Sequence, residues 1–256
     1  MKPSRLCLQF LIVMPFILLA QNRDVQSKTS KTNSIGMQLV LVQPGTFQMG
    51  GDDVWKDEKP IHSVTITKPF FIGQYEVTQK QWREVMGTNP SKFQGDNRPV
   101  ENVSWNDAQD FMRKLNEKES TTKYRLPTEA EWEFAARGST QNNSYKFSGS
   151  SNVADVAVYT ENSGRQTKPV GSLRPNELGI YDMSGNVYEW CSDWYGPYRA
   201  VAQTDPKGPI PGKYRVLRGG SYLDLGAYHC RVAARSYYYY PNNRYLNLVG
   251  FRCVQD

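Results

Sequence analysis

The stretch from Tyr222 to Val249 contains no Lys, Glu, Gln, Met or Trp, although these five types are common elsewhere in the chain. It nevertheless holds seven of the 16 tyrosines. A codon that ends in a pyrimidine encodes none of the five missing types. Asn codons (AAC or AAT) changed only at their adenines reach Tyr, His, Asp, Ser, Leu, Ala and Arg, and these types dominate the stretch. Such a composition indicates a surface varied for binding rather than a catalytic site.

Histidine and cysteine are scarce, with two His and four Cys in the chain. Two histidines exclude an iron site built from three. His62 lies in a strand-like segment and is interpreted as structural, whereas His229 lies in the varied stretch and is a candidate ligand contact. Cys191, Cys230 and Cys253 would allow one disulfide and one free thiol in an exported protein, and the sequence leaves the pairing open.

No apolar run is long enough to span a membrane comfortably, because a spanning helix needs about 20 apolar residues. Leu6–Ala20 is shorter, and Lys2 and Arg5 precede it. This pattern is typical of a secretory signal over residues 1–20 and predicts a secreted, periplasmic or cell-surface protein. The alternative is an uncleaved N-terminus that attaches the protein to a membrane.

The remaining chain is mildly basic. Loss of Lys2 and Arg5 with the signal lowers the formal net charge from +6 to +4. The basic residues are scattered, so no nucleic-acid partner is expected. Residues 21–33 are polar and predict a disordered linker. Residues 34–256, about 220 in number, fit one domain.

Three helices are predicted, each from a capping box in which a Ser or Thr is followed three residues later by Gln, Asp or Glu. The pairs are Thr78 with Gln81, Ser104 with Asp107, and Thr128 with Glu131. Gly87 and Gly138 mark two helix ends. Residues 37–42 and 62–68 are strand-like. The chain after Gly138 is turn-rich and predicts short strands at most, so the fold class is α+β.

The chain carries a series of motifs in order: GMQLVLVQPGTFQMGG, TKPFFIGQYEVTQKQW, NRPVENVSWNDAQDFMRKLN, YRLPTEAEWEFAARG, ELGIYDMSGNVYEWCSDWYG, YRVLRGGSY, CRVAAR and GFRC. Together they resemble the sulfatase-modifying-factor family, which includes the formylglycine-generating enzyme, and they extend from Ile35 to Cys253. The resemblance implies a variant of the C-type lectin fold with little regular secondary structure. It does not by itself imply the activity.

The resemblance also implies where the enzyme's two copper-binding cysteines would lie, five residues apart after the Gly-Gly-Ser-Tyr motif. Counted forward, the positions are Asp224 and His229; counted back from the Ala-Ala-Arg motif, the second falls on Ala227. None is a thiol, the ligand that copper(I) chemistry requires, and Cys230 lacks a partner. The protein is therefore expected to have no catalytic residues and no catalytic cofactor. The alternative is a formylglycine-generating oxidoreductase or an accessory factor for exported proteins.

Calcium is the metal that the resemblance still implies, because calcium takes carboxylate and carbonyl oxygens in flexible geometry. The predicted ligands are the side chains of Asp182 and Glu189 and the carbonyls of Gly185 and Val187, with a second set at Asn152 and Val153. The alternative is that these groups hydrogen-bond their loops without a metal.

The C-terminal stretch further resembles the variable proteins of diversity-generating retroelements, in which a reverse transcriptase copies a template with adenine-specific errors. The resemblance implies a solvent face of varied side chains that binds a macromolecule, a protein or surface glycan, on another cell or a host. Tyrosine suits this role because it is large, rigid and amphipathic. The predicted ligand-binding residues are Tyr222, Leu223, Asp224, Leu225, Ala227, His229, Ser236, Tyr237, Tyr238, Tyr239, Tyr240, Asn242, Asn243, Tyr245, Leu246, Asn247 and Leu248. The alternative is that the tyrosines are core, with Tyr222, which matches the family motif, as part of the framework.

The other large or charged motif residues are predicted to be structural. Arginines expected to pair with acids or to brace the last hairpins are Arg125, Arg137, Arg218, Arg231, Arg235 and Arg252. Aromatic residues expected in the core are Trp82, Trp105, Trp132, Phe134, Trp190 and Trp194.

Overall fold

The computed structural model describes residues 29–52, 54–141, 144–237, 240–243 and 247–256. The predicted signal peptide therefore lies outside the described residues. Within the described ranges, no helix is long and apolar enough to cross a membrane. The elements in chain order are β1 (Ser30–Thr32), β2 (Gln38–Val42), β3 (Gly45–Met49), η1 (Lys56–Glu58), β4 (His62–Ile66), β5 (Phe70–Gly73), α2 (Gln79–Met86), α3 (Trp105–Lys118), β6 (Tyr124–Arg125), α4 (Glu129–Ala136), η2 (Ser139–Gln141), α5 (Val153–Val156), α6 (Thr160–Ser163), β7 (Tyr188–Trp194), β8 (Gln203–Thr204), β9 (Arg215–Arg218), η3 (Ala227–Cys230), β10 (Val249–Gly250) and β11 (Val254–Gln255).

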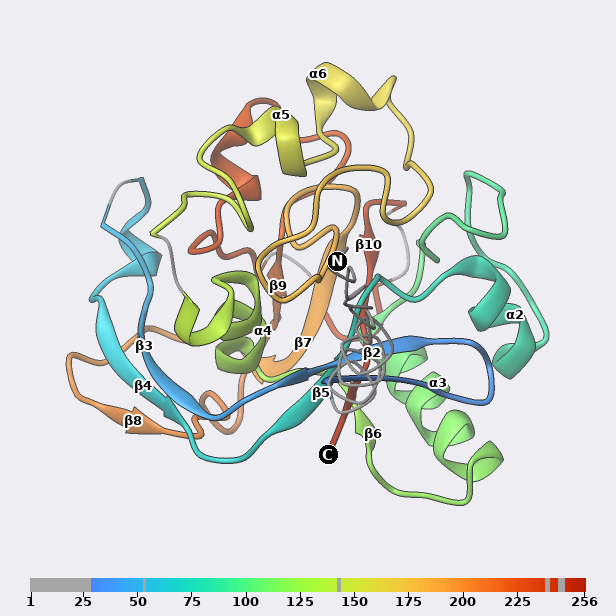
Figure 1. Cartoon of the computed structure of the whole chain (residues 1–256), viewed down its shortest axis with the longest axis horizontal. Helices are drawn as coiled ribbons and strands as arrows, with labels where there is room; N and C mark the ends of the chain where they lie inside the picture. The colour runs from blue at the N-terminus through green and yellow to red at the C-terminus, as the bar shows by residue number, and fades with distance from the viewer. Residues whose placement is uncertain (1–28, 53, 142–143, 238–239, 244–246) are drawn as a thin grey trace, which may run out of the picture.

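The strands form three small sheets, with orders β1-β2-β5-β11-β6, β10-β7-β9 and β3-β4-β8. Helices α2 and α3 lie on one side of the molecule and β3, β4 and β8 on the other, with α4 between β4 and β7 (Figure 1). The C-terminal strand β11 pairs with both β5 and β6, so the chain end closes the first sheet. The molecule thus combines helices and strands without a βαβ repeat, as the predicted α+β class requires.

All three predicted helix starts are confirmed. Each of α2, α3 and α4 begins with a capping box, in which the N-cap hydroxyl accepts the backbone N–H three residues on and that residue's side chain accepts the N-cap N–H. The box satisfies donors that a helix start otherwise leaves unpaired. Gly87 ends α2 with a φ of 76°, in the left-handed region that glycine adopts at least cost.

The predicted strands at 37–42 and 62–68 are confirmed as β2 and β4. The linker prediction is wrong at its end, because Ser30–Thr32 inside the predicted 21–33 linker forms β1 and pairs with β2. Its backbone hydrogen bonds do not depend on apolar side chains, and the ammonium of Lys31 lies 3.5 Å from the ring centroid of Phe71. The expectation of only short strands after Gly138 is also wrong, because β7 runs for seven residues.

Two large apolar clusters form the core. One joins α2 and α3, where Trp82 stacks on Phe111 with ring centroids 5.5 Å apart. The other joins α4 to the strands around Trp132. Trp190, Phe134, Trp132 and Trp82 are buried as predicted. Trp105 and Trp194 are only partly buried, contrary to the core prediction, because each stacks on the guanidinium of Arg215.

Candidate ligand-binding face

The predicted ligand-binding residues differ widely in exposure. Tyr222 and Ser236 are buried. Those that are partly buried are Leu223, Asp224, Ala227, His229, Tyr237, Asn243, Asn247 and Leu248, and those that are exposed are Leu225, Tyr240 and Asn242. Tyr238, Tyr239, Tyr245 and Leu246 lie outside the described residues. The described part of the stretch therefore contains both framework and surface.

Tyr222 is framework, so its prediction as a ligand contact is wrong. Its side chain is 0% exposed, its ring meets Phe93 edge-on, and its hydroxyl accepts a 2.5 Å hydrogen bond from Asn247 Nδ2. Ser236 is likewise buried, because it pairs with Leu217 through both backbone hydrogen bonds. The ring of Tyr222 and the backbone of Ser236 are thus engaged within the protein and are not available to a ligand.

Asp224 closes a turn. Its carboxylate accepts hydrogen bonds from Ser221 N at 2.6 Å and from the Tyr188 hydroxyl at 3.0 Å. Gly220 precedes this turn with a φ of 77°, and a Cβ there would lie 2.9 Å from the backbone of His229. Only glycine fits this approach. Asp224 therefore shapes the position where the related enzyme would need a thiol.

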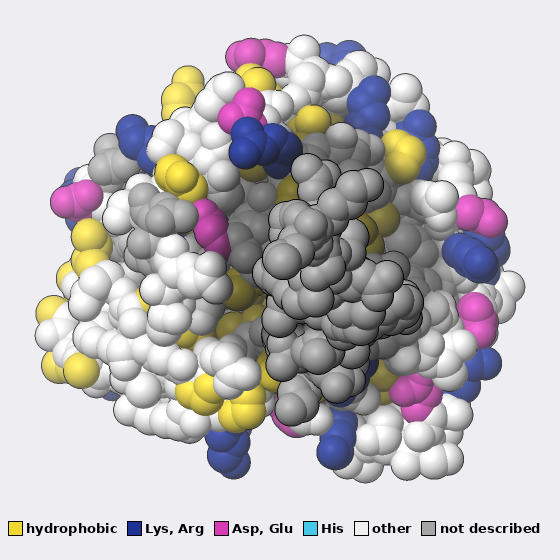
Figure 2. Space-filling view, viewed as in Figure 1, with side chains coloured by type: hydrophobic (Ala, Val, Ile, Leu, Met, Phe, Trp, Pro, Cys, Tyr) yellow, Lys and Arg dark blue, Asp and Glu magenta, His cyan; other side chains and the backbone are white. Residues whose placement is uncertain are grey.

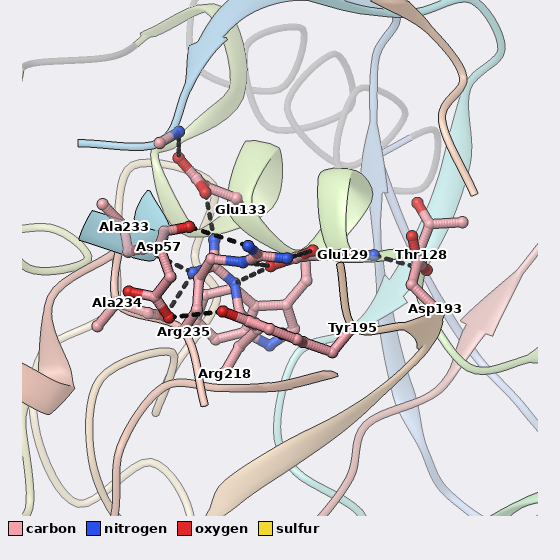
Figure 3. Close-up of polar contacts among 12 residues, drawn as sticks. Asp57, Thr128, Glu129, Glu133, Asp193, Tyr195, Arg218, Ala233, Ala234 and Arg235 are labelled. Atoms are coloured by element: carbon pink, nitrogen blue, oxygen red, sulfur yellow. Dashed lines mark hydrogen bonds and ion pairs between the residues drawn. The ribbon is translucent and has the colours of Figure 1, made fainter. Parts of the chain in front are cut away.

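A column of side chains runs from the core to Tyr237, and Figure 3 shows its inner part, Glu129, Arg235 and Tyr195. Glu129 accepts two hydrogen bonds from Arg235, at 2.6 and 2.8 Å, and the Arg235 guanidinium lies 4.5 Å from the ring centroid of Tyr195. Tyr195 in turn stacks on Tyr237 with centroids 3.8 Å apart, and its hydroxyl donates to Asp57. The base of Tyr237 is thus fixed by buried charge and a rigid ring.

Two further tyrosine rings lie near Tyr237, and one of them is exposed. The ring of Tyr214 lies 6.3 Å from Tyr237 and 5.0 Å from Tyr240, which is 48% exposed. The ammonium of Lys213 lies 5.0 Å from the ring of Tyr214 and 5.7 Å from that of Tyr240. Aromatic rings at such spacings attract one another and a nearby cation. We call Tyr195, Tyr214, Tyr237, Tyr240 and Lys213 the tyrosine cluster.

A second column of side chains has the same arrangement: a buried Glu–Arg pair, then an aromatic ring, then a residue of the varied stretch. Glu58 pairs with both terminal nitrogens of Arg231, whose guanidinium lies 5.6 Å from the ring centroid of Trp55. Trp55 then contacts His229, with ring centroids 4.6 Å apart, and His229 also meets Tyr188 edge-on. In both columns a buried Glu–Arg pair carries a fixed aromatic ring, and that ring carries a residue of the varied stretch.

An apolar surface lies beside the second column. Leu225 is 78% exposed and Tyr228 55% exposed. Tyr228 lines a hollow of about 450 Å³ together with Val54, Phe147 and Ala227 among others. Exposed apolar side chains beside a hollow are typical of binding surfaces. Tyr228 belongs to this surface although sequence reasoning left it out of the predicted ligand-binding residues.

The predicted bracing arginines are confirmed. Buried ion pairs join Arg218 to Glu133, Arg231 to Glu58, Arg235 to Glu129 and Arg252 to Glu189, while Arg137 pairs with Glu133 and the partly exposed Arg125 with Glu131 and Asp256. Burial alone would raise the pKa of Glu133, but Arg137 and Arg218 outweigh it and hold that pKa below its ordinary value. His62 is structural as predicted, with Nδ1 3.0 Å from the Pro60 carbonyl.

The three described cysteines are free thiols, so the expected disulfide does not form. Cys253 lies in the α2–α3 core, Cys191 in the α4 core, and Cys230 in a third, small cluster with Phe147 and Tyr159. Separate clusters keep the sulfurs apart. Burial raises the pKa of all three thiols above the ordinary value. Cys230 is therefore a packed thiol rather than an accessible thiolate.

The predicted calcium ligands around Asp182 lie in a region rich in buried carboxyl groups. Glu76, Asp182 and Glu189 surround Arg252, whose guanidinium donates to both oxygens of Glu189 at 2.6 and 2.7 Å. Burial, followed by the charges of Asp182 and Glu189, raises the pKa of Glu76 well above its ordinary value. Burial also raises the pKa of Asp182 to about 6. The site thus has more carboxyl groups than cationic side chains, and Asp182 is less engaged than Glu189.

The second predicted calcium set has internal partners. The Asn152 side-chain oxygen accepts from Ala154 N as the N-cap of α5, and the Val153 carbonyl accepts from Ala157 N. Both oxygens therefore stabilise the short helix. Among the described residues, no group of three or more His, Cys, Asp or Glu side chains is arranged to hold a metal ion.

The buried carboxyl group of Asp193, next to Glu129 of the first column, should make the stability of the fold depend on pH. Burial, with the like charge of Glu129, raises the pKa of Asp193 from 3.8 to about 7. Between these values the folded protein keeps a proton that the unfolded chain has lost, so stability should fall as pH rises through this window and level off above it. Urea unfolding at several pH values should show a flatter fall for Asp193→Asn. An identical slope in wild type and variant would contradict the assignment.

Sequence reasoning missed the fixed half of the face: Trp55, Tyr195, Lys213 and Tyr214. None of these residues lies in the varied stretch. Trp55 and Tyr195 are remote from it in sequence, and Lys213 and Tyr214 precede it without sharing its composition. The only available signal is the Arg231–Arg235 spacing in CRVAAR, which separates two structural arginines by four residues. That spacing does not reveal which aromatic rings pack against these two arginines.

The fold and the face define a lectin-type scaffold that displays a C-terminal aromatic surface. The family model of the sulfatase-modifying factor enzyme 1-like domain matches residues 24–256, and the chain belongs to this family. The structure is similar to Treponema denticola variable protein 1, with a TM-score of 0.81 and 33% identity over 88% of this chain and 98% of that one. It is also similar to PvdO from Pseudomonas aeruginosa, with a TM-score of 0.74 and 28% identity. Both the family and the likeness to a variable protein, and with them the C-type lectin-like fold, are confirmed.

Characterised relatives carry several functions. The chain is 36% identical to the chaperone protein LppX of Paenibacillus barcinonensis, over 81% of this chain and 87% of that protein. It is 42% identical to the formylglycine-generating enzyme of Streptomyces coelicolor, over 68% of this chain and 58% of the enzyme. The mouse enzyme is 36% identical over 77% of this chain. The chain spans little more than half the length of these two enzymes.

Proposed function

We propose that this chain is a non-catalytic, exported variable protein that binds a macromolecular ligand through its C-terminal face. The observation that carries the proposal is the pair of columns, in which framework Glu, Arg and ring residues support His229 and Tyr237. Such support fixes the outermost side chains before binding and so reduces the entropy lost on binding. The likeness to a solved variable protein over most of both chains supports the same function.

The state of the thiols argues against catalysis. Where the oxidase would need two cysteines, this chain has Asp224 in a turn and His229 on Trp55. Cys230 is buried, and its raised pKa opposes the thiolate that binds copper. The second candidate is nevertheless a formylglycine-generating oxidoreductase or accessory factor, favoured by 42% identity to the Streptomyces enzyme. Copper-dependent oxygen consumption with a cysteine peptide would establish that alternative.

The gene itself provides the test. Sequencing the locus in many isolates should show substitutions concentrated at the exposed positions of residues 222–249, with Tyr222 and Arg231–Arg235 unchanged. A near-copy of these codons with adenines at the variable positions, beside a reverse transcriptase gene, should lie nearby. Identical residues at these positions in all isolates, with no template copy, would refute the proposal.

Export rests on the N-terminal pattern of basic residues followed by an apolar run, and we propose a secreted, periplasmic or cell-surface location. The ligand would then be a protein or surface glycan on another cell or a host. On the face in Figure 2, Lys and Arg are scattered rather than gathered into a stripe, which agrees with a partner other than nucleic acid. N-terminal sequencing of the mature protein would distinguish cleavage after Ala20 from an uncleaved membrane attachment.

We further propose structural calcium near Asp182, with Gly185 and Val187 as carbonyl ligands. The excess of buried carboxyl groups supports a cation there, whereas Glu189 already pairs with Arg252. Calcium at 100 times its Kd should stabilise the fold by about 2.7 kcal/mol. Thermal unfolding with calcium and with EDTA should therefore differ in wild type but not in Asp182→Ala. Asn152→Ala tests the other predicted set, and no effect of EDTA on wild type would remove calcium altogether.

A further inference from the structure

A second cavity lies away from the varied stretch. Its volume is about 790 Å³, and none of its lining residues belongs to residues 222–249. Ile66 and Phe70 form a buried apolar wall, and Ile210, 88% exposed, stands at the edge. The volume lies within the range of about 300–1,000 Å³ that small-molecule sites occupy.

The antiparallel pair of strands β7 and β9 separates this cavity from the tyrosine cluster. Trp194 and Arg215 are paired across the two strands and line the cavity. The next pair, Tyr195 and Tyr214, is joined by a 2.8 Å backbone hydrogen bond and contacts Tyr237 instead. Successive residues of a strand point to opposite faces. The cavity and the proposed ligand face therefore lie on opposite sides of the same strand pair.

Arg215 is the unusual group in the cavity. Its guanidinium is stacked between two indoles, 3.7 Å from the ring centroid of Trp105 and 3.5 Å from that of Trp194. Nη1 donates a 2.6 Å hydrogen bond to the Ser192 carbonyl, but the buried Nε has no hydrogen-bond partner. Within the described residues Arg215 forms no ion pair. Burial lowers its pKa to about 10, and the charge of the nearby Asp193, which acts in the opposite direction, does not offset this. This arginine is held rigidly without a carboxylate in direct contact.

The carboxylates that line the cavity have other partners than Arg215. Arg125 is paired with both Glu131 and Asp256. Asp205 hydrogen-bonds Thr67 and lies near Lys68 and Lys207, which lower its pKa further. Four cationic and three anionic side chains line the cavity. The excess is one positive charge.

We propose that this cavity binds a small organic anion, a carboxylate carried on an aromatic or apolar body. The carboxylate pairs with Arg215, with Lys68 and Lys207 at the edge, and the body packs against Phe70 and Trp194. A planar guanidinium suits a carboxylate because it donates parallel hydrogen bonds. The carboxylate belongs either to a free aromatic acid or to the C-terminus of a peptide.

Calorimetry on the full chain tests the charge requirement. Naphthalene-2-carboxylate should bind about tenfold more tightly than naphthalene-2-carboxamide, because a charge-assisted pair contributes more than a neutral hydrogen bond. Arg215→Gln should reduce the affinity for the acid to that for the amide. The peptide Gly-Gly-Phe with a free or an amidated C-terminus, compared with the free acid, distinguishes the two sources of carboxylate. Equal affinities for acid and amide, or no binding of any carboxylate at millimolar concentration, would overturn the proposal.

Because Arg215 also packs between two tryptophans, exposed variants provide an independent measurement. Lys207→Glu at the cavity edge should weaken binding of the acid several-fold while leaving the amide unchanged. Lys80→Glu makes the same charge change on α2, outside the cavity, and should leave both affinities as in wild type. Equal effects of Lys207→Glu and Lys80→Glu on the acid would show a long-range charge effect and refute a defined site.

Discussion

Glu133→Gln is expected to lower the free energy of unfolding by about 3–5 kcal/mol, the loss typical when one member of a buried ion pair is removed. Glu133 is fully buried and accepts hydrogen bonds from Gly50 N at 2.9 Å and Arg137 at 2.7 Å, as well as from Arg218. Gln keeps the shape but not the charge, so Arg218 would stay buried without its main partner. Since whole domains are stable by only about 5–15 kcal/mol, this change approaches the stability of the fold.

Urea unfolding of wild type and Glu133→Gln measures this loss. Asp110→Asn is the matched control, because Asp110 pairs with Arg113 and Lys114 on the exposed face of α3 and should contribute less than about 1 kcal/mol. The Arg218 guanidinium also donates to the carbonyls of Ala233 and Ala234 (Figure 3). A loss below about 1 kcal/mol for Glu133→Gln would mean that this network does not hold the segment between the two columns.

Tyr237→Ser combined with Tyr240→Ser is expected to weaken ligand capture at least 30-fold, because a few aromatic residues commonly carry 2 kcal/mol or more each at interfaces. Stability should change little, since Tyr240 is 48% exposed and Tyr237 is half-buried on the surface of Tyr195. Flow cytometry of the labelled protein on a cell panel that wild type binds gives the affinity. Thermal unfolding of the same samples gives the stability.

Tyr222→Ser is the matched comparison, with the same substitution at a framework position. Its ring is fully buried, so truncation should cost about 3–5 kcal/mol. If the double Tyr237/Tyr240 variant loses as much stability as Tyr222→Ser, the cluster is core and the binding proposal fails. Unchanged capture by a well-folded double variant would equally contradict the proposed face.

Local sequence patterns predicted the elements that local contacts determine. The capping boxes at Thr78, Ser104 and Thr128 identified the three main helices, because the hydrogen bonds concerned join residues only three apart. The alternation at 62–68 identified β4 in the same way. Strand β1 was missed, because its polar side chains carry no strand signal and only pairing with β2 forms it.

The candidate site was predicted less completely. Composition identified the varied stretch and therefore Tyr237, Tyr240 and His229. It could not distinguish these from Tyr222, which has the same residue type but is buried against Phe93. Exposure depends on contacts between segments far apart in the chain, such as the 129 residues that separate Phe93 from Tyr222. The fixed rings of the face were missed for the same reason.

Residue types and spacings alone were enough to identify the family, the helix starts, the structural role of the arginines and the tyrosine-rich segment of unusual composition. Each of these depends on residue types and short spacings. Three findings needed the folded structure: Trp55 and Tyr195 carry His229 and Tyr237, the cysteines stay apart, and Arg215 has no carboxylate in direct contact. These depend on burial and on long-range packing, which place side chains together without regard to their distance in the chain.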